Sequence, residues 1–356
     1  MNHLEFHRSP EPLPEIGPDA SNSPLNSDRS LGRILVIRGG AIGDFILTLP
    51  VLAALRRQFP RTHLEVLGYP HIVQLALAGG LADGVMSIEA RALAGFFAVK
   101  GILDETLADY FASFHLMISY LYDPDGVFRI NVARASGAEF ISGAHRPDEK
   151  GALHATEVFL RPLERLAIFG ADSVPRLGLE MSSHKPAGWP PALGFQTGSE
   201  CPQSPRLALH PGSGGERKNW PEHNWAELMR WLADHTEASV LLVGGEAEGD
   251  RVRRLAALLP ADRVEVAQNR PLVELATRLR RCRTFVGHDS GISHLAAALG
   301  LEGLILWGTT NQSVWAPRSP RMKILRHEGG LDALTVRQVR QELALLLNRH
   351  SAHLRS

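Results

Sequence analysis

The sequence predicts an α/β protein built from two doubly wound parallel sheets that face each other across a cleft. Short apolar runs alternate with helical patterns in both halves of the 356-residue chain, as expected of parallel βαβ units. A proline-containing stretch at 182–205 shows little periodicity, which is typical of a connection between two domains. Glycine clusters follow several apolar runs, at the strand ends where doubly wound sheets bind ligands.

The first half is expected to begin after a disordered extension. Residues 1–30 carry several prolines among polar neighbours and no hydrophobic period, so they cannot offset the entropy of ordering. The first domain then spans 31–181. Its apolar runs predict strands at 34–37, 64–67, 85–88, 116–120 and 140–142, and its helical periods predict helices at 42–58, near 72–78 and at about 153–169.

The strand–helix alternation restarts in a second domain that spans 206–330. Strands are predicted at 207–210, 240–243, 264–266, 284–286 and 304–307, and helices near 225–235, 251–259, 272–281 and 292–299. The segment 331–356 contains a last helix at about 336–348, which we consider able to pack back on the first domain.

Composition excludes several classes of protein. The chain is 44% hydrophobic and 21% charged with zero net charge, as in soluble globular proteins, and bulk charge gives no reason to expect a nucleic-acid partner. Cys201 and Cys282 are too few for a disulfide framework or a zinc site. No apolar run is long enough for a membrane-spanning helix, and the start of the chain lacks a signal-peptide core. We therefore expect a cytoplasmic protein.

The glycine turn at 210–218 predicts half of a diphosphate site. Its glycines leave backbone N–H groups free to meet phosphate at the end of a strand. Ser213 adds a hydroxyl donor beside Gly214, and Lys218 supplies the positive charge that a departing diphosphate needs. A solvated surface lysine is the alternative, and Arg217 is a second candidate cation.

The turn at 287–294 predicts the other half of that site. Gly291 permits close approach of the backbone to phosphate, and Ser290 contributes an N–H group at the start of a helix. His294 lies one turn into that helix and is placed to hydrogen-bond a phosphate oxygen, unless it is satisfied within the fold. Asp289 is unsuited to an anion, so we expect it to order the loop or to contact a sugar hydroxyl.

Two acidic residues complete the set of candidates. Gly43 and Asp44 end the first glycine turn and open a helix, where Asp44 either stabilises the helix dipole or acts as a general base toward the phosphate-binding domain. Glu248 follows the strand at 240–243. It is placed to accept hydrogen bonds from ribose hydroxyls, or it is an acid at a helix N-terminus.

A metal site is not expected. Asp123-Pro-Asp125 resembles the metal-binding pair of some sugar transferases, but Asp-Pro-Asp-Gly is strong turn chemistry, and the turn is the interpretation we favour. The histidines form no cluster with ligand spacing. Arg91 and Arg129 are candidates for an anionic acceptor, although we favour an ordinary surface position for both.

Taken together, these motifs resemble glycosyltransferase family 9, the ADP-heptose:lipopolysaccharide heptosyltransferases. No single motif suffices, but four occur in register across about 33–347. They are Gly43-Asp44 with Pro50, His210-Pro-Gly-Ser-Gly with Lys218-Asn-Trp-Pro221, Gly244-Gly245-x-x-Glu248, and Asp289-Ser-Gly-x-Ser-His294.

The resemblance implies a GT-B fold of two facing Rossmann-like domains, with the acceptor on the first and the nucleotide sugar on the second. It makes Asp44 the base of an inverting, metal-independent transfer without a cofactor, and Lys218 the partner of the leaving diphosphate. It implies a ribose contact for Glu248 and a donor loop of Asp289, Gly291 and His294.

The same resemblance implies the partners. They are ADP-heptose as donor, a lipid A–Kdo or inner-core saccharide as acceptor, and peripheral contact with the inner membrane. The alternatives are another nucleotide sugar, an acceptor outside lipopolysaccharide, or an epimerase or hydrolase of nucleotide sugars.

Overall fold

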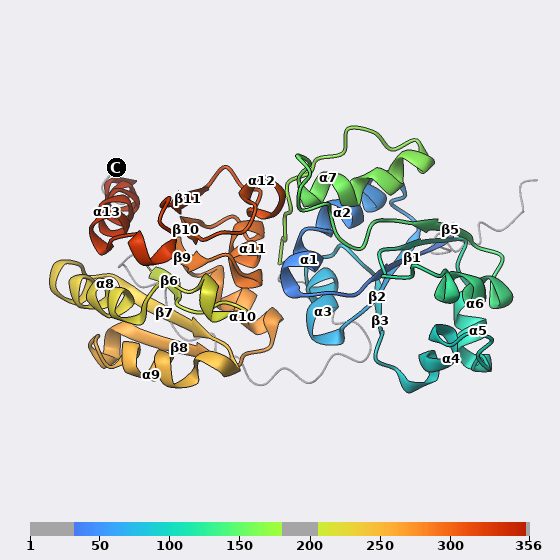
Figure 1. Ribbon diagram of the computed structural model, residues 1–356, viewed down its shortest axis with the longest axis horizontal. Helices are drawn as coiled ribbons and strands as arrows, with labels where there is room; N and C mark the ends of the chain where they lie inside the picture. The colour runs from blue at the N-terminus through green and yellow to red at the C-terminus, as the bar shows by residue number, and fades with distance from the viewer. Residues whose placement is uncertain (1–31, 180–205, 354–356) are drawn as a thin grey trace, which may run out of the picture. The chain divides into compact units, whose positions relative to one another are not determined.

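The computed structural model describes residues 32–179 and 206–353 and contains one parallel sheet in each half of the chain (Figure 1). The first sheet has the strand order β3-β2-β1-β4-β5 and the second has the order β11-β10-β9-β6-β7-β8. Strand order reverses beside β1 and beside β6, as in doubly wound sheets. The α/β prediction is confirmed. The extension predicted at 1–30 and the connection predicted at 182–205 lie outside the described residues.

Residues 32–179 form five strands and seven α-helices. The strands are β1 (Arg33–Arg38), β2 (His63–Gly68), β3 (Gly84–Ser87), β4 (Leu116–Ser119) and β5 (Glu139–Ser142). The helices are α1 (Ile42–Ile46), α2 (Leu49–Gln58), α3 (Pro70–Ala78), α4 (Ala94–Phe97), α5 (Glu105–Ala112), α6 (Val127–Ala135) and α7 (Ala155–Leu160). Short 3₁₀ segments lie at Arg91–Leu93 and Arg161–Leu166.

Helices cover both faces of the first sheet, so its central strand is buried on both sides (Figure 1). On one face Val36 packs in a cluster with Leu52 of α2 and Val73 of α3. On the other face Leu35 packs with Phe111 of α5. This double burial explains why β1 is a continuous apolar run in the sequence.

Two helices are shorter than predicted. The helix predicted at 42–58 is divided into α1 and α2, and Pro50 lies in the first turn of α2, where its missing N–H is tolerated. The helix predicted at 153–169 is α only over α7 and continues as a 3₁₀ segment whose first turn contains Pro162. Both corrections have the same cause, because proline cannot donate an interior helical hydrogen bond.

Within 206–353 the chain forms six strands and six α-helices. The strands are β6 (Arg206–His210), β7 (Ser239–Gly244), β8 (Val264–Gln268), β9 (Thr284–His288), β10 (Glu302–Trp307) and β11 (Met322–Arg326). The helices are α8 (Glu222–His235), α9 (Gly249–Ala256), α10 (Leu272–Leu279), α11 (Gly291–Ala298), α12 (Gln312–Trp315) and α13 (Val336–His353). Short 3₁₀ segments lie at Glu216–Lys218, Glu246–Glu248, Ala261–Arg263 and Leu331–Ala333.

The C-terminal helix packs on the second sheet. α13 contacts β10 and α8, and its Val339 and Leu343 are fully buried in the cluster that contains Leu304 and Trp225. The expectation that this helix packs back on the first domain is therefore wrong. Its apolar stripe covers a face of the second sheet that would otherwise meet water.

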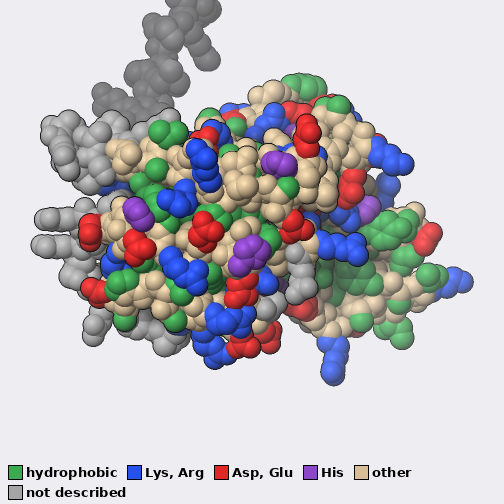
Figure 2. Space-filling view, turned by 60° about the vertical axis from the view of Figure 1, so that its left-hand side comes forward, with side chains coloured by type: hydrophobic (Ala, Val, Ile, Leu, Met, Phe, Trp, Pro, Cys, Tyr) green, Lys and Arg blue, Asp and Glu red, His purple; other side chains and the backbone are tan. Residues whose placement is uncertain are grey.

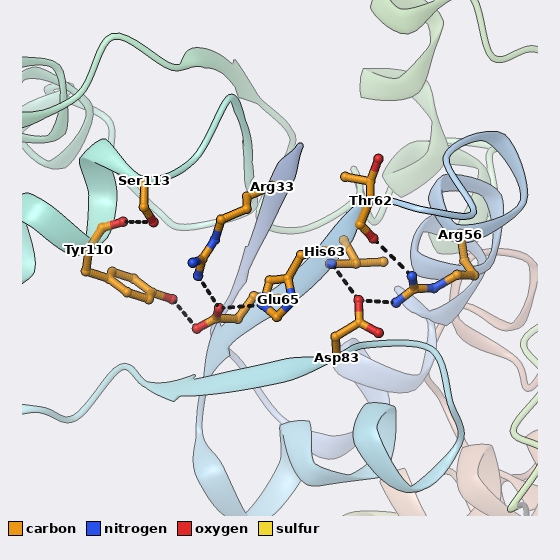
Figure 3. Close-up of polar contacts among 9 residues, drawn as sticks. Arg33, Arg56, Thr62, His63, Glu65, Asp83, Tyr110 and Ser113 are labelled. Atoms are coloured by element: carbon orange, nitrogen blue, oxygen red, sulfur yellow. Dashed lines mark hydrogen bonds and ion pairs between the residues drawn. The ribbon is translucent and has the colours of Figure 1, made fainter. Parts of the chain in front are cut away.

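Polar side chains join the amino ends of β1 and β2 (Figure 3). Glu65 accepts hydrogen bonds from Arg33 Nη2 at 3.1 Å and from the Tyr110 hydroxyl at 2.7 Å. Burial, followed by the Glu65 charge, raises the pKa of Tyr110, so this phenol stays a donor. A buried carboxylate is tolerated here because two donors satisfy it.

One face of the molecule carries charges of both signs. The face in Figure 2 carries basic and acidic side chains interspersed among one another, in keeping with the zero net charge of the chain. Within the ranges 32–179 and 206–353, no helix is both long enough and apolar enough to cross a membrane.

Candidate active site

The first glycine turn and the last one meet where α1 lies against α11. A Cβ atom placed on Gly291 would lie 2.6 Å from Ile42 Cβ and 3.0 Å from the Gly43 nitrogen. Such distances are below those of real contacts, so only glycine fits at position 291 without displacing α1. The approach brings the N-terminal residues of both helices to the rim of one hollow region.

Two adjoining cavities occupy this region. One has a volume of 430 Å³ and the other 900 Å³. They share the wall formed by Ala41, Gly43, Gly214, Ser290 and Gly291. A ligand with one end in each cavity would therefore pass the glycine turns.

All ten predicted site residues line these cavities. Ser213 and Glu248 line the smaller one, which we call the donor cavity. Asp44, Lys218, Asp289 and His294 line the larger one, which we call the transfer cavity. Gly43, Gly214, Ser290 and Gly291 line both.

Asp44 lies at the rim of the transfer cavity with its side chain 22% exposed. Its Oδ2 accepts the Ala41 N–H at 3.0 Å, which closes the turn before α1. The turn needs Gly40 in the left-handed region, at φ 99°. Asp44 thus caps a helix and also presents a carboxylate to the cavity, so its two predicted roles are compatible in one geometry.

Arg38 holds Asp44 from behind, and the sequence analysis missed it. Its side chain is only 2% exposed, and its Nη2 lies 3.6 Å from Asp44 Oδ1. Its Nη1 donates to the His145 carbonyl at 2.9 Å, and the guanidinium lies 4.5 Å from the centre of the Phe159 ring. Burial lowers the pKa of Arg38, and the Asp44 charge opposes that shift. An ionised Asp44 therefore offsets part of the cost of burying this cation.

Lys218 reaches the transfer cavity and meets Asp289. Lys218 Nζ lies 2.7 Å from Asp289 Oδ2, with exposed side-chain fractions of 45% and 10%. The contact joins the turn after β6 to the turn after β9. Asp289 therefore fixes the loop and the cation together, in keeping with the ordering role expected for it.

Three buried histidines lie around the glycine turns. Burial lowers the pKa of His294 and of His288 to about 4 and that of His210 to about 3, so all three are neutral at pH 7. His288 Nε2 accepts the Trp220 N–H at 2.8 Å, which leaves its Nδ1–H to donate to the Gly212 carbonyl at 3.2 Å. His288 thus fixes both ends of the turn that carries Lys218.

The Glu248 side chain is buried and lies in the wall of the donor cavity. Its Oε2 accepts the Gly245 N–H at 2.8 Å. A Cβ atom placed on Gly212 would lie 2.5 Å from Glu248 Oε1, so the carboxylate lies directly against the turn after β6. The helix-terminal role considered for Glu248 is present in the structure, and the ribose contact stays a prediction.

Two further segments complete the transfer cavity. One contributes Arg146, Glu149 and Lys150, and the other contributes Thr309, Thr310, Asn311 and Trp315. Asn311 Nδ2 donates to the Glu149 carbonyl at 2.8 Å, which joins the loops. The cationic residues of the wall are therefore Arg146 and Lys150 beside Arg217 and Lys218, whereas Arg91 and Arg129 are exposed and line neither cavity.

The Asp-Pro-Asp segment is a turn, as predicted. Asp123 Oδ1 accepts the Phe128 N–H at 3.1 Å, and its Oδ2 accepts the Arg129 N–H at 3.0 Å, so both oxygens cap the start of α6. Nowhere in the described part of the chain do three or more His, Cys, Asp or Glu side chains group in a way that could hold a metal ion.

Comparison with known proteins identifies the domain that carries Lys218 and Asp289. Residues 175–342 match glycosyltransferase family 9 (heptosyltransferase). The chain carries a glycosyltransferase family 9 domain. Lipopolysaccharide heptosyltransferase 1 of Pseudomonas aeruginosa is 36% identical over 110 residues, which are 31% of this chain and 30% of that protein. The chain thus spans less than a third of this curated relative in that alignment.

Solved structures extend the likeness of the family 9 domain to the fold of both halves. The glycosyl transferase family 9 structure from Veillonella parvula superposes with a TM-score of 0.71 at 18% identity, covering 89% of this chain and 98% of that one. The ADP-heptose lps heptosyltransferase II of E. coli superposes with a TM-score of 0.69 at 17% identity, covering 90% and 99%. The expected GT-B fold is confirmed.

Proposed function

We propose that the protein is an inverting glycosyltransferase that moves a heptose from ADP-heptose to a saccharide of the lipopolysaccharide core. The observation that carries this proposal is one cavity lined by a carboxylate of the first half, Asp44, and a cation of the second half, Lys218. The family 9 match and the named heptosyltransferase relative support the choice of sugar.

The donor cavity suits the nucleoside of an ADP-sugar. Its wall includes the apolar side chains of Val243, Ala267, Leu272 and Leu275, which give a flat base an apolar surface. Glu248 would accept hydrogen bonds from the ribose. The diphosphate would then cross the shared glycine wall, where backbone N–H groups at the start of α11 favour an anion.

In the transfer cavity the chemistry would be a single displacement. Asp44 accepts the proton of the acceptor hydroxyl as its oxygen attacks the anomeric carbon, and the bond from that carbon to the diphosphate breaks on the opposite face. Lys218, backbone N–H groups and His294 stabilise the departing ADP. Attack opposite the leaving group inverts the anomeric centre. Because Lys218 supplies positive charge at the leaving group, the step needs no metal ion.

The acceptor would be lipid A–Kdo or an inner-core saccharide, bound on the side of the transfer cavity formed by the first half. Arg146 and Lys150 give that wall two cations for an anionic sugar. Because such an acceptor carries lipid, we propose a cytoplasmic protein that makes peripheral contact with the inner face of the membrane.

Calorimetric titration tests the donor assignment directly. ADP, UDP and GDP are titrated separately, followed by ADP-heptose, and we expect selective ADP binding that the sugar strengthens. Preference for UDP or GDP would overturn the donor assignment. Release of free sugar without acceptor would instead indicate a hydrolase, and rearrangement of the sugar without acceptor would indicate an epimerase. Transfer that persists in saturating chelator is expected of the metal-independent step.

A further inference from the structure

His210, the last residue of β6, has a buried side chain in the wall of the donor cavity. It is 5% exposed, and it lines the donor cavity but not the transfer cavity. Strand β6 pairs with β9, and Figure 1 shows the two strands side by side. His210 lies opposite Gly287 in their register. The imidazole therefore stands between the turn that follows β6 and the turn that follows β9.

One ring nitrogen of His210 has a protein partner and the other has none among residues 32–179 and 206–353. Nδ1 lies 3.3 Å from the Ser290 hydroxyl oxygen. Nε2 makes no hydrogen bond with the described part of the chain. Buried polar atoms in proteins are nearly always hydrogen-bonded. A buried ring nitrogen without a protein partner, on the wall of a cavity, is therefore available to a bound molecule.

The ring is neutral, so it offers one donor and one acceptor. Burial, followed by the nearby His288, lowers the pKa of His210 to about 3. A neutral imidazole carries its proton on one nitrogen and a free lone pair on the other. The hydrogen bond at Nδ1 therefore decides whether Nε2 donates or accepts.

The Ser290 hydroxyl can support either tautomer. Ser293 Oγ donates to the His288 carbonyl, so the proton of that hydroxyl is already in use. Ser290 Oγ lies 3.3 Å from Ser293 Oγ and 3.3 Å from His210 Nδ1. When Ser290 donates to Ser293, Nδ1 carries the imidazole proton. When Ser290 donates to Nδ1, the proton is on Nε2, and rotation of one hydroxyl has made His210 a donor toward the cavity.

The surroundings of His210 favour an anion as the acceptor of that hydrogen bond. Ser290 is the N-cap of α11, and its hydroxyl accepts the Ser293 N–H at 3.3 Å. The N–H groups at the start of this helix attract negative charge. Glu248, the buried carboxylate of the same cavity, accepts the Gly245 N–H and would repel a phosphate, so it suits the ribose. Because His210 does not line the transfer cavity, its contact falls on the nucleoside side of the diphosphate.

We propose that His210 Nε2 donates a hydrogen bond to the phosphate nearest the nucleoside of the nucleotide-sugar donor. The Ser290 hydroxyl holds the tautomer that this bond needs. The inference rests on the proposed function for the presence of a nucleoside diphosphate. It adds to that function a residue that recognises the inner phosphate.

Calorimetric titration of the full-length protein with adenosine, AMP and ADP tests this contact. His210→Phe keeps a ring of similar size and leaves Ser290 free to donate to Ser293, but it removes both ring nitrogens. We expect it to bind ADP and AMP roughly 10- to 100-fold more weakly, as for loss of a hydrogen bond to a charged group, and adenosine as the wild type does. His210→Gln brings an amide N–H near the place of Nε2 and should bind ADP more tightly than His210→Phe.

His235→Phe provides the matched control, because His235 is exposed on α8 and lines neither cavity. It should bind all three ligands as the wild type does. Equal weakening of adenosine, AMP and ADP by His210→Phe would overturn the proposal, since His210 would then only shape the cavity wall. Weakening of ADP without weakening of AMP would overturn the assignment to the inner phosphate.

The tautomer of His210 gives a second test that uses the wild-type protein alone. The ¹⁵N NMR shifts of the imidazole should show the proton on Nε2 in the ADP complex, and a proton on Nδ1 there would contradict the proposal. Tighter binding of uridine or guanosine nucleotides would contradict the donor of the proposed function instead. The nucleoside, monophosphate and diphosphate of the preferred base would then test His210 in the same way.

Discussion

Arg38 and Asp44 face each other across the first glycine turn, with Arg38 Nη2 3.6 Å from Asp44 Oδ1 and the arginine side chain almost fully buried. The guanidinium is fixed in turn by the carbonyl of His145 and by the ring of Phe159. The buried Arg38 therefore positions the proposed base, Asp44. Arg38 is itself positioned by His145 and Phe159, which are distant from it in sequence.

Replacing Arg38 by methionine should impair both folding and transfer. The substitution leaves a buried carbonyl without its donor, so we expect the free energy of unfolding to fall by about 1–3 kcal/mol. Because Asp44 loses its support, kcat should fall more than the KM for the donor rises. Arg33→Met is the matched control, since Arg33 pairs with Glu65 at the other end of β1. If both variants lose transfer equally, the effect of Arg38 is one of general stability.

Replacing Lys218 by alanine should weaken catalysis with little effect on stability. We expect kcat to fall by about 10²–10³, as when one stabilising group is removed from a leaving oxyanion, together with weaker ADP binding. The pair is half-exposed, because the Lys218 side chain is 45% exposed and that of Asp289 is 10% exposed, so we expect only a modest fall in unfolding temperature. Lys323→Ala is the control, because Lys323 is also an exposed lysine paired with a carboxylate, at 2.6 Å from Glu342. A change in unfolding temperature alone would make Lys218 a structural residue.

Replacing Gly291 by alanine should separate the two glycine turns. The new Cβ would overlap Ile42, so we expect a loss of about 1–3 kcal/mol of unfolding free energy and a parallel loss of donor affinity and turnover. Gly137→Ala provides the comparison, because a Cβ there meets nothing within 4 Å. Donor affinity and turnover at wild-type levels in the Gly291 variant would show that the close contact of α1 and α11 is not needed.

The buried histidines should make stability depend on pH. Their pKa values are lowered to about 3 for His210 and about 4 for His288 and His294, against about 6.5 in the unfolded chain. Above pH 6.5 both states are neutral and these groups add no pH dependence. Below pH 6.5 these histidines become protonated in the unfolded chain but stay neutral in the folded chain. Each histidine therefore lowers the free energy of unfolding by about 1.4 kcal/mol per pH unit down to about pH 4.

Denaturant titrations between pH 7 and pH 4 measure that slope. His288→Gln keeps an acceptor for the Trp220 N–H and a donor for the Gly212 carbonyl, and it should reduce the slope by one histidine's share. The exposed His235 on α8 provides the matched control for a histidine-to-glutamine substitution at the surface. An unchanged slope in the His288 variant would contradict the neutral, buried state of that ring.

Ten of the eleven strands were predictable because most of them are apolar runs buried between helices. β11 was missed, since it is an edge strand whose Lys323 and Arg326 face solvent, and its pattern is that of a surface segment. Helices α4, α5, α6 and α12 were also missed. Of these, α4 and α12 have four residues each, which is too short for a helical period to be recognised.

The residues of the candidate site were predictable where the functional side chains belong to a single glycine turn of the sequence. Each of its ten residues stands in a glycine turn or beside one, so local sequence was enough to select them. Arg38 ends β1 directly before such a turn, but its inward direction depends on Phe159 and His145, which no local pattern relates to it. The same is true of Arg146 and Lys150, whose place in the cavity wall is set by the joining of two distant loops.

The measurement that tests the central claim most directly is transfer by Asp44→Asn in a single turnover, with ADP affinity measured on the same sample. We predict that the rate falls by about 10²–10⁴, as for removal of a general base, while ADP affinity stays within about twofold of the wild type, since the proposed mechanism gives Asp44 a contact with the acceptor and none with the nucleotide. The exposed Asp125 provides the control, and Asp125→Asn should transfer at the wild-type rate. A wild-type rate in Asp44→Asn would contradict the account, because the carboxylate at the rim of the transfer cavity would then not be the base.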